Sequence, residues 1–281
     1  MITYDDNTLI NKKHSLVMIT GASGGLGKAF AVECASRGWD LFLTDLRPEP
    51  LEALANSLQN TYSIKVLTQA CDLTKAEARA ELLAQVKEAG NFFWGLINVA
   101  GLDYEGPFHE QSTCQIQTIL RLNIEGTLGM IHGMMDFRDP LKRFHIINVA
   151  SLAGFFPMPI KATYAASKRF LLDFSLALRS ELKDAGATVT ALCPAGLATT
   201  DKCIESIQSQ GIMGLLTTEN VSTVANQTLN AALKGKAVCI PGGLNQFMRI
   251  ASAFLPRTAI ANLIGIRWRA TRQRVSAGSS S

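Results

Sequence analysis

A tyrosine and a lysine stand four positions apart in the segment Tyr164-Ala-Ala-Ser-Lys168. On a helix their side chains would share a face, because residues four positions apart are neighbours on a helix surface. A free tyrosine has a pKa of about 10 and is a poor acid or base at neutral pH, but a cation within about 4–6 Å favours the phenolate. The pair is therefore a candidate for proton transfer, with Lys168 lowering the pKa of Tyr164.

A serine lies upstream of this pair, directly after an apolar run at 144–150. If that run is a strand of a parallel sheet, Ser151 stands at the carboxyl edge, where ligands bind in α/β folds. Its hydroxyl could then polarise a carbonyl oxygen in the same crevice. A tyrosine–lysine pair alone matches many proteins by chance, and the serine makes the combination more specific.

A glycine-rich loop, TGASGGLG at 20–27, follows the apolar run 15–19. Glycines permit positive φ and let backbone N–H groups approach a phosphate at the N-terminus of the next helix. An ordinary strand-to-helix turn would explain the loop alone equally well. Asp45 favours the dinucleotide interpretation, because it follows the loop by roughly 20 residues, where such folds place an acid on the adenosine ribose. The alternative for Asp45 is a solvated loop acid or a helix cap.

Short apolar runs alternate with longer amphipathic stretches along the chain. The runs span 15–19, 39–44, 64–70, 93–99, 144–150, 187–193 and 237–240. The helical patterns span 28–37, 49–60, 75–89, 109–137, 162–185 and 217–234. Continuous apolar runs are typical of strands buried on both faces, as in a parallel sheet covered by helices. We therefore predict a single doubly wound, Rossmann-type α/β domain with a seven-stranded parallel sheet.

Composition narrows the class of protein. Of the 281 residues 47% are hydrophobic and 18% charged, which indicates a globular chain, and the modest net charge of +4 argues against nucleic acid as a partner. The six cysteines show neither CxxC pairs nor metal-ligand spacing, so we expect no metal site and buried free thiols in a cytoplasmic protein. The N-terminus is unlike a signal peptide, and no apolar run reaches the roughly 18 residues of a membrane span.

With these motifs in order, the chain resembles the short-chain dehydrogenase/reductase family over about residues 14–243. In that family a TGxxxGxG loop, an NNAG-type segment, a mid-helix Asn, a Ser and a YxxxK pair follow one another. Here the same order is 20–27, Asn98-Val99-Ala100-Gly101, Asn123, Ser151, and Tyr164 with Lys168.

The resemblance implies roles for four catalytic residues. Tyr164 would exchange a proton with the substrate oxygen while hydride moves to or from nicotinamide C4. Lys168 would hold the nicotinamide ribose, and Ser151 would hydrogen-bond the substrate oxygen. Asn123 would hold a water in a proton relay. From its own residue type, Asn123 could equally be a helix-interior amide that satisfies backbone groups.

The resemblance also implies a cofactor site in which Asp72 lies beside the adenine and Thr199 meets the nicotinamide carboxamide. The full predicted set is Gly21, Ser23, Gly24, Gly25, Leu26, Gly27, Asp45, Leu46, Asp72, Leu73, Asn98, Ala100, Gly101, Tyr164, Lys168, Pro194, Gly196, Leu197 and Thr199. The sequence departs from the family pattern twice: Val99 replaces the second Asn of NNAG, and Ala195 stands where Gly is usual after the sixth strand.

We expect NAD as the cofactor, with NADP as the alternative. An acid at the end of the second strand repels the 2′-phosphate of NADP. Family members that prefer NADP place a basic residue just after this acid or inside the glycine loop, where this chain has Leu46 and Ser23-Gly24. Arg47 is the residue that could still bind a 2′-phosphate.

The expected substrate is a lipophilic small molecule. The segment after Ser151 and a lid at about 195–216 are apolar, which suits a lipophilic ketone or secondary alcohol, such as a hydroxysteroid or an acyl-chain substrate of lipid metabolism. Ordinary core or subunit packing is an equally weighted alternative.

The domain at 1–243 is followed by an apolar and basic extension at 244–274 and a flexible tail at 275–281. We interpret the extension as packing near the substrate mouth, with a partner-docking helix pair or a peripheral membrane contact as alternatives.

The sequence as a whole predicts an NAD(P)-dependent oxidoreductase that assembles as a homodimer or homotetramer. The alternatives are a 3-oxoacyl-type NADPH reductase and a non-catalytic dinucleotide-binding scaffold. A scaffold would have no need of Asn123, Ser151, Tyr164 and Lys168 together.

Overall fold

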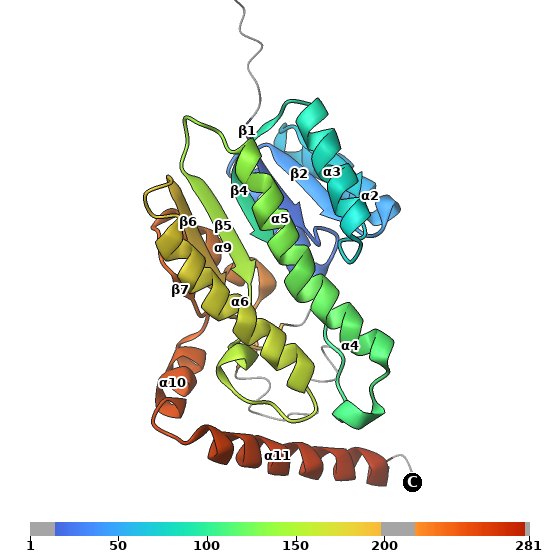
Figure 1. The fold of residues 1–281 in the computed structure, drawn as a ribbon, viewed down its shortest axis with the longest axis vertical. Helices are drawn as coiled ribbons and strands as arrows, with labels where there is room; N and C mark the ends of the chain where they lie inside the picture. Colours follow the sequence, from blue (N-terminus) through green and yellow to red (C-terminus); the bar gives the residue numbers. More distant parts are fainter. Residues whose placement is uncertain (1–14, 198–216, 279–281) are drawn as a thin grey trace, which may run out of the picture.

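The computed structural model describes residues 15–197 and 217–278, and these residues form one parallel sheet flanked by helices. The strands are β1 Ser15–Thr20, β2 Leu41–Asp45, β3 Val66–Ala70, β4 Phe92–Asn98, β5 Phe144–Val149, β6 Ala187–Leu192 and β7 Val238–Cys239. Their order is β3-β2-β1-β4-β5-β6-β7, and every neighbouring pair is parallel (Figure 1). The strand order reverses between β1 and β4. The predicted seven-stranded, doubly wound fold is therefore confirmed.

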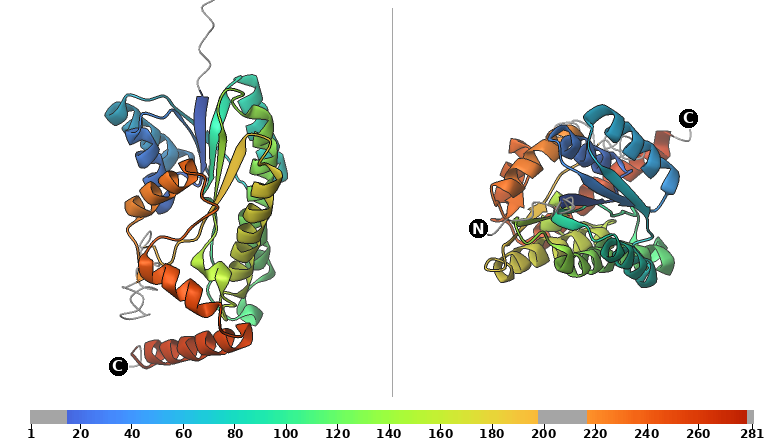
Figure 2. Two further views of the ribbon diagram at one scale, coloured as in Figure 1. Left: turned by 90° about the vertical axis from the view of Figure 1, so that its left-hand side faces the viewer. Right: turned by 90° about the horizontal axis from the view of Figure 1, so that it is seen from above.

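Helices cover both faces of the sheet (Figure 2). One layer contains α1 Gly25–Ser36, α2 Pro48–Tyr62 and α9 Val221–Leu233, and the other contains α3 Ala76–Glu88, α5 Thr127–Met134 and α6 Ala162–Glu181. Side chains of β1 alternate between the layers: Val17 and Ile19 join the cluster around Phe30, whereas Leu16 and Met18 join the cluster around Met130. Both alternating sets are buried, which explains why the strand is a continuous apolar run.

The helix predicted at 109–137 is divided in the structure. Helix α4 spans Thr113–Leu120, and a π-helical segment at Arg121–Gly126 joins it to α5. The wider turn of a π-helix leaves no mark in hydrophobic periodicity, so the sequence predicted one continuous helix. Such segments are frequent at functional sites, and this one carries Asn123.

Two helices follow the last strand, α10 Gly243–Ser252 and α11 Arg257–Gly278. They lie beyond the carboxyl ends of the strands, and α11 runs across that end of the molecule (Figure 1). Helix α11 includes residues 275–278, which the sequence analysis assigned to a flexible tail. No proline or glycine occurs between Gly265 and Gly278 to end the helix earlier.

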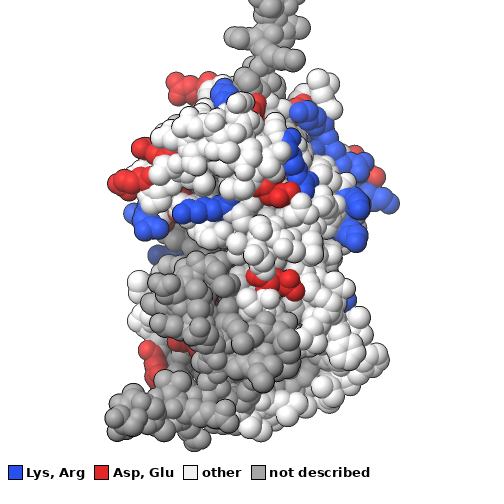
Figure 3. Space-filling view, turned by 180° about the vertical axis from the view of Figure 1, so that it is seen from behind, with Lys and Arg blue, Asp and Glu red and all other residues white. Residues whose placement is uncertain are grey.

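The charged side chains are unevenly distributed. On the face seen from behind, most of the Lys, Arg, Asp and Glu side chains that are coloured lie toward the sheet end opposite α11 (Figure 3). No helix in the described part of the chain has the length and apolar character needed to span a bilayer.

The cysteines that the structure describes are free thiols. Cys34, Cys71 and Cys193 are buried, and Cys239 is partly buried. The expectation of burial is wrong for Cys114, which is exposed on α4, and Cys203 lies outside the described residues.

Candidate active site

A cavity of about 1490 Å³ opens at the carboxyl ends of the strands. Its walls come from the glycine loop, the ends of β2 and β5, the start of α6, and helices α10 and α11. Parallel strands all end at the same edge of a sheet, so segments far apart in the chain meet there. Every predicted cofactor residue within the described ranges lines this cavity except Asn98.

The glycine loop follows β1 and leads into α1 with a backbone that side chains would obstruct. Gly21 has a φ of +65°, and a Cβ added there would lie 2.7 Å from the backbone nitrogen of Ala100. A Cβ on Gly27 would overlap the Gly21 carbonyl oxygen. Both glycines are therefore required by close packing of the loop, which leaves the N-terminus of α1 open toward the cavity.

The Asp45 carboxylate joins the end of β2 to the glycine loop. Its Oδ2 accepts a hydrogen bond from the Ser23 N–H at 2.9 Å, and its Oδ1 accepts one from the Leu46 N–H at 2.7 Å. The N-cap of α2 is Arg47, which makes no side-chain cap, so Asp45 does not cap that helix. Asp45, Leu46 and Arg47 all line the cavity.

Asp72, after β3, lies in the same wall. Its carboxylate accepts hydrogen bonds from the Thr74 hydroxyl at 2.6 Å and the Thr74 N–H at 3.0 Å. The hydroxyl bond is the main cause that lowers the pKa of Asp72. Leu73 beside it and Ala100 after β4 add apolar side chains to the wall of the same cavity.

Asn98 was predicted to bind the cofactor, but it does not line the cavity. It is buried and donates to the Asn148 Oδ1 at 2.9 Å, and Asn148 in turn donates to the Ser175 hydroxyl at 2.9 Å. This chain of side chains links β4, β5 and α6. Asn98 therefore supports the sheet beneath the cavity rather than lining it.

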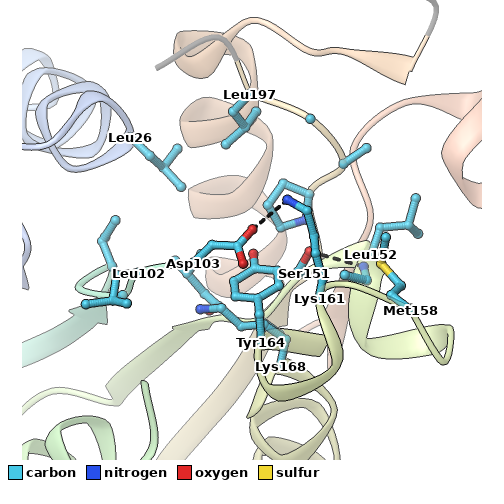
Figure 4. A pocket seen from close by; sticks show the side chains of 18 of the residues that line it. Leu26, Leu102, Asp103, Ser151, Leu152, Met158, Lys161, Tyr164, Lys168 and Leu197 are labelled. Atoms are coloured by element: carbon cyan, nitrogen blue, oxygen red, sulfur yellow. Dashed lines mark hydrogen bonds and ion pairs between the residues drawn. The ribbon is translucent and has the colours of Figure 1, made fainter. Parts of the chain in front are cut away.

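Ser151, Tyr164 and Lys168 lie together at the inner end of the cavity (Figure 4). The Ser151 oxygen accepts a hydrogen bond from the Ala153 N–H at 3.1 Å, which leaves its own hydrogen available for donation. Lys168 is buried below the tyrosine, with its Nζ 5.8 Å from the centre of the Tyr164 ring and 2.8 Å from the Val149 carbonyl oxygen that accepts from it.

Burial lowers the pKa of Lys168 to about 8, and the nearby Asp103 carboxylate offsets part of that effect. At neutral pH the ammonium is still mostly protonated. It therefore places a positive charge beside the phenol, as the spacing of the two residues predicts.

Asn123 is buried in the π-helical segment and does not line the cavity. Its Oδ1 accepts from the Leu102 N–H at 2.9 Å, and its Nδ2 donates to the Leu102 carbonyl at 3.1 Å and to the Ser167 hydroxyl at 3.0 Å. These bonds correspond to the alternative in which the amide satisfies backbone groups. The role in a proton relay remains a prediction.

A charged cluster beside Tyr164 was missed by the sequence analysis. The Lys161 ammonium pairs with Asp103 at 2.6 Å and with Glu105 at 3.1 Å, and it lies 5.9 Å from the centre of the Tyr164 ring (Figure 4). Burial alone would lower the pKa of Lys161, but the two carboxylates outweigh it and the pKa is raised. Lys161 precedes Tyr164 by three positions, and this helical spacing was the available signal.

The outer part of the cavity is apolar. Phe156 and Met158, from the loop before α6, line it together with apolar side chains of the two C-terminal helices and of the turn between them. These are Phe247, Met248, Leu255, Ile260, Leu263, Ile264 and Trp268. The cavity thus combines a polar inner end with a large apolar entrance.

The segment after β6 completes the wall with Pro194, Ala195, Gly196 and Leu197. The Glu219 N–H donates to the Gly196 carbonyl at 3.3 Å, which holds this segment against the chain that leads into α9. Ala195 is accommodated at the position where Gly was expected. Thr199 and the predicted lid beyond residue 197 lie outside the described residues.

Comparison with known proteins gives a family match and many relatives. The family model of the short chain dehydrogenases matches residues 15–209. A sulfoacetaldehyde reductase of Chromohalobacter salexigens is 35% identical over 66% of this chain and 73% of its own. A very-long-chain 3-oxoacyl-CoA reductase of Neurospora crassa is 36% identical over 63% of this chain, and the match spans 54% of that relative's length.

Solved structures have the same fold. A structure described for 7beta-hydroxysteroid dehydrogenase stereoselectivity aligns with a TM-score of 0.80 at 22% identity, over 91% of this chain and 98% of that one. A short-chain dehydrogenase from Sphingobium yanoikuyae in complex with NADPH aligns with a TM-score of 0.70 at 27% identity, over 86% and 97%.

Proposed function

The protein belongs to the short chain dehydrogenase family of NAD(P)-dependent oxidoreductases, and from this premise we propose that it transfers hydride between NAD and a lipophilic ketone or secondary alcohol. One observation carries the proposal. Tyr164, with the Lys168 ammonium 5.8 Å from its ring, shares a cavity with Ser151 and the glycine loop. Proton-transfer groups and a dinucleotide cradle thus face the same space.

The residues present fit a dinucleotide. The crowding at Gly21 and Gly27 leaves backbone N–H groups and the N-terminus of α1 facing the cavity, where a pyrophosphate would bind. Asp45 would take the adenosine ribose and Asp72 the adenine edge. When bound, the nicotinamide supplies or accepts the hydride.

The proton follows a path through this chain's own residues. In reduction the Tyr164 hydroxyl gives its proton to the substrate oxygen, and in oxidation the phenolate takes it back. The Ser151 hydroxyl donates a hydrogen bond to the same oxygen, because the Ala153 N–H engages only the Ser151 oxygen and leaves the hydroxyl hydrogen available. The Lys168 ammonium stabilises the phenolate between the two steps.

NAD is the proposed cofactor because Asp45 places a carboxylate where NADP carries its 2′-phosphate. Each oxygen of Asp45 accepts one backbone hydrogen bond, so further lone pairs remain for the two ribose hydroxyls. A 3-oxoacyl-type NADPH reductase remains the second candidate, supported by the relatives of that name and by Arg47 in the cavity wall.

The apolar entrance supports a lipophilic substrate, either hydroxysteroid-like or with an acyl chain. The free thiols support a reducing, cytoplasmic location.

The test is a turnover screen in both directions with NAD(H) and NADP(H) and a panel of short-chain, acyl-chain and steroid ketones and alcohols. We expect turnover with lipophilic members of the panel. Cofactor binding without turnover on any substrate would instead support the scaffold alternative.

Tyr164→Phe is the matching variant. We expect it to lose nearly all turnover and to retain cofactor binding, because only the proton-transfer group is removed. Tyr62→Phe on α2, outside the cavity wall, is the control and should keep full activity. If Tyr164→Phe keeps more than roughly a tenth of kcat, the acid–base assignment is wrong.

A further inference from the structure

Helices α10 and α11 and the turn between them present apolar side chains to solvent instead of burying them. The exposed fractions are 84% for Phe254, 65% for Phe247, 60% for Leu263, 58% for Ile266 and 54% for Ile250. We call these five residues the C-terminal apolar surface. Soluble proteins rarely expose large contiguous apolar patches, and those they do expose mark interaction sites.

The arrangement of α10 is inverted relative to an ordinary surface helix. Leu244, Phe247 and Ala251 on α10 and Phe254 just after it recur at spacings of three and four, so they form one stripe, and all are exposed. The buried residue of this helix is the polar Asn245, which donates to the Pro241 carbonyl at 2.9 Å. A typical helix would turn such an apolar stripe toward the core.

The other side of α10 is attached to the protein body. The Arg249 guanidinium lies 5.3 Å from the centre of the Phe155 ring, which precedes α6. By helical periodicity Arg249 lies on the side of α10 opposite the stripe, so this contact holds that other side against the segment before α6.

The charged residues of the same segment are all positive. Residues 243–278 contain six arginines and no aspartate or glutamate. Arg257 is exposed at the start of α11, next to the exposed Phe254. Apolar side chains together with an excess of arginine are the signature of a helix lying on an anionic membrane surface.

The C-terminal apolar surface is continuous with the cavity entrance. Phe247 and Leu263 belong to the surface and also line the cavity. Both helices lie beyond the carboxyl ends of the strands, where the cavity opens (Figures 1 and 2).

We propose that α10 and α11 dock on the surface of an anionic phospholipid bilayer, with the cavity entrance turned toward the lipid. The apolar side chains enter the acyl boundary, and the arginines of α11, beginning with Arg257, contact lipid phosphates. Docking depends only on this surface. Entry of a lipophilic substrate directly from the bilayer is a consequence that rests on the proposed function.

The experiment measures binding of the full chain to sedimented vesicles of phosphatidylcholine alone or mixed with phosphatidylglycerol. We expect binding to the mixed vesicles and much weaker binding to the neutral ones, with affinity falling as NaCl rises because salt screens the arginines. The double substitution Ile250→Ser with Phe254→Ser should weaken binding at least about tenfold, since two apolar side chains that would enter the bilayer are lost.

Leu141→Ser is the matched control. Leu141 is 93% exposed and precedes β5, outside the C-terminal helices, so its replacement should leave vesicle binding unchanged. Ile250 and Phe254 do not line the cavity, and the double variant should therefore turn over a short, water-soluble substrate at the wild-type rate. An unchanged far-UV circular dichroism spectrum would show that the variant folds.

The proposal is overturned if the wild type fails to bind mixed vesicles at low salt, or if the double variant binds as tightly as the wild type. A wild-type oligomer that the double substitution dissociates, without any vesicle binding, would assign the surface to a second copy of the chain. Vesicle binding by a protein that turns over no substrate would refute the proposed function and leave the docking proposal intact.

Discussion

At the scale of single residues, Asp45 has two tasks that can be separated by substitution. Its carboxylate fixes the glycine loop through the Ser23 N–H, and its charge faces the position of the adenosine ribose. A substitution that keeps the acceptor and removes the charge can distinguish these tasks. Asn is such a substitution, since its side-chain oxygen can still accept from Ser23.

We expect the wild type to prefer NAD over NADP by at least roughly tenfold in kcat/KM, about 1.4 kcal/mol. Asp45→Asn and Asp45→Ser should both lose most of this preference, chiefly by improving the use of NADP, because like-charge repulsion is removed. Asp45→Ser with Leu46→Arg should reverse it. Measuring kcat/KM for both cofactors on one substrate tests the assignment. A wild-type preference for NADP would favour Arg47 as a phosphate clamp instead.

The buried charge of Lys168 serves the proposed reaction but lowers the stability of the folded protein. Its pKa falls to about 8 in the folded protein from an ordinary value of 10.5, so folding disfavours the charged form. The cost in folding free energy of burying the Lys168 ammonium is fully present below about pH 8. It decreases as the pH rises and is lost above 10.5, where the lysine is neutral in the unfolded chain as well. The hydrogen bond to Val149 offsets part of it.

We therefore expect Lys168→Met to abolish turnover and yet to gain thermal stability relative to the wild type at pH 7. The difference in Tm should shift back toward the wild type at pH 10, where the native lysine is neutral. Each kcal/mol would correspond to about 2–4 °C in Tm for a chain of this size class. Thermal unfolding followed by circular dichroism at both pH values checks this. A Tm difference that does not depend on pH would mean that Lys168 is not buried as a charged group.

At the scale of elements, the start of α6 is fastened to the loop that follows β4. Lys161 holds Asp103 and Glu105, and the Gly106 N–H donates to the Ile160 carbonyl at 2.8 Å. This places Tyr164 between two ammonium groups, those of Lys161 and Lys168. The two carboxylates of the loop stand near the same ring, so the balance of charge there depends on both elements.

Lys161→Met should move the pH–rate profile to higher pH, because two carboxylates are left uncompensated beside the phenol and disfavour its ionised form. Asp103→Asn should move the profile in the opposite direction. Lys161→Arg should restore the wild-type profile if the positive charge is what matters. Profiles of kcat against pH for the three variants provide the measurement. Identical profiles would limit the cluster to a structural role.

At the scale of the whole molecule, the layer formed by α4 and α6 carries exposed apolar side chains of its own. Leu120 on α4 is 39% exposed, and Phe170 and Leu176 on α6 are each 40% exposed. The two helices pack side by side, so their exposed sides are neighbours in this layer. We propose this face as the interface of the expected homodimer or homotetramer.

Phe170→Glu should dissociate the assembly, because a buried unpaired charge at an interface is costly. The mass in solution, measured by light scattering, should fall to that of one chain, 30.4 kDa. Leu233→Glu on α9, where the leucine is 44% exposed in the opposite layer, is the control and should leave the mass unchanged. The interface assignment fails if Phe170→Glu keeps the wild-type mass.

Local features of the sequence were sufficient for the fold and for most of the cavity wall. Apolar runs long enough for a strand and buried on both faces predict a parallel sheet, and a glycine loop after the first run predicts where a dinucleotide binds. Tyr164 and Lys168 share a helix face through their spacing alone. These patterns can be interpreted from the sequence alone because each depends only on residues that are close together along the chain.

Contacts between distant segments required the tertiary structure. The Asn98 side chain donates a hydrogen bond to Asn148 and does not line the cavity, and the Asn123 side chain is hydrogen-bonded to the backbone of Leu102. Lys161 forms an ion pair with Asp103, which is 58 positions away in the sequence. No local pattern encodes which partner a buried amide or a surface ammonium will find, because that depends on how the sheet brings loops together. The outward apolar stripe of α10 belongs to the same class: its periodicity is visible in the sequence, but which side faces solvent is decided by packing against the rest of the molecule.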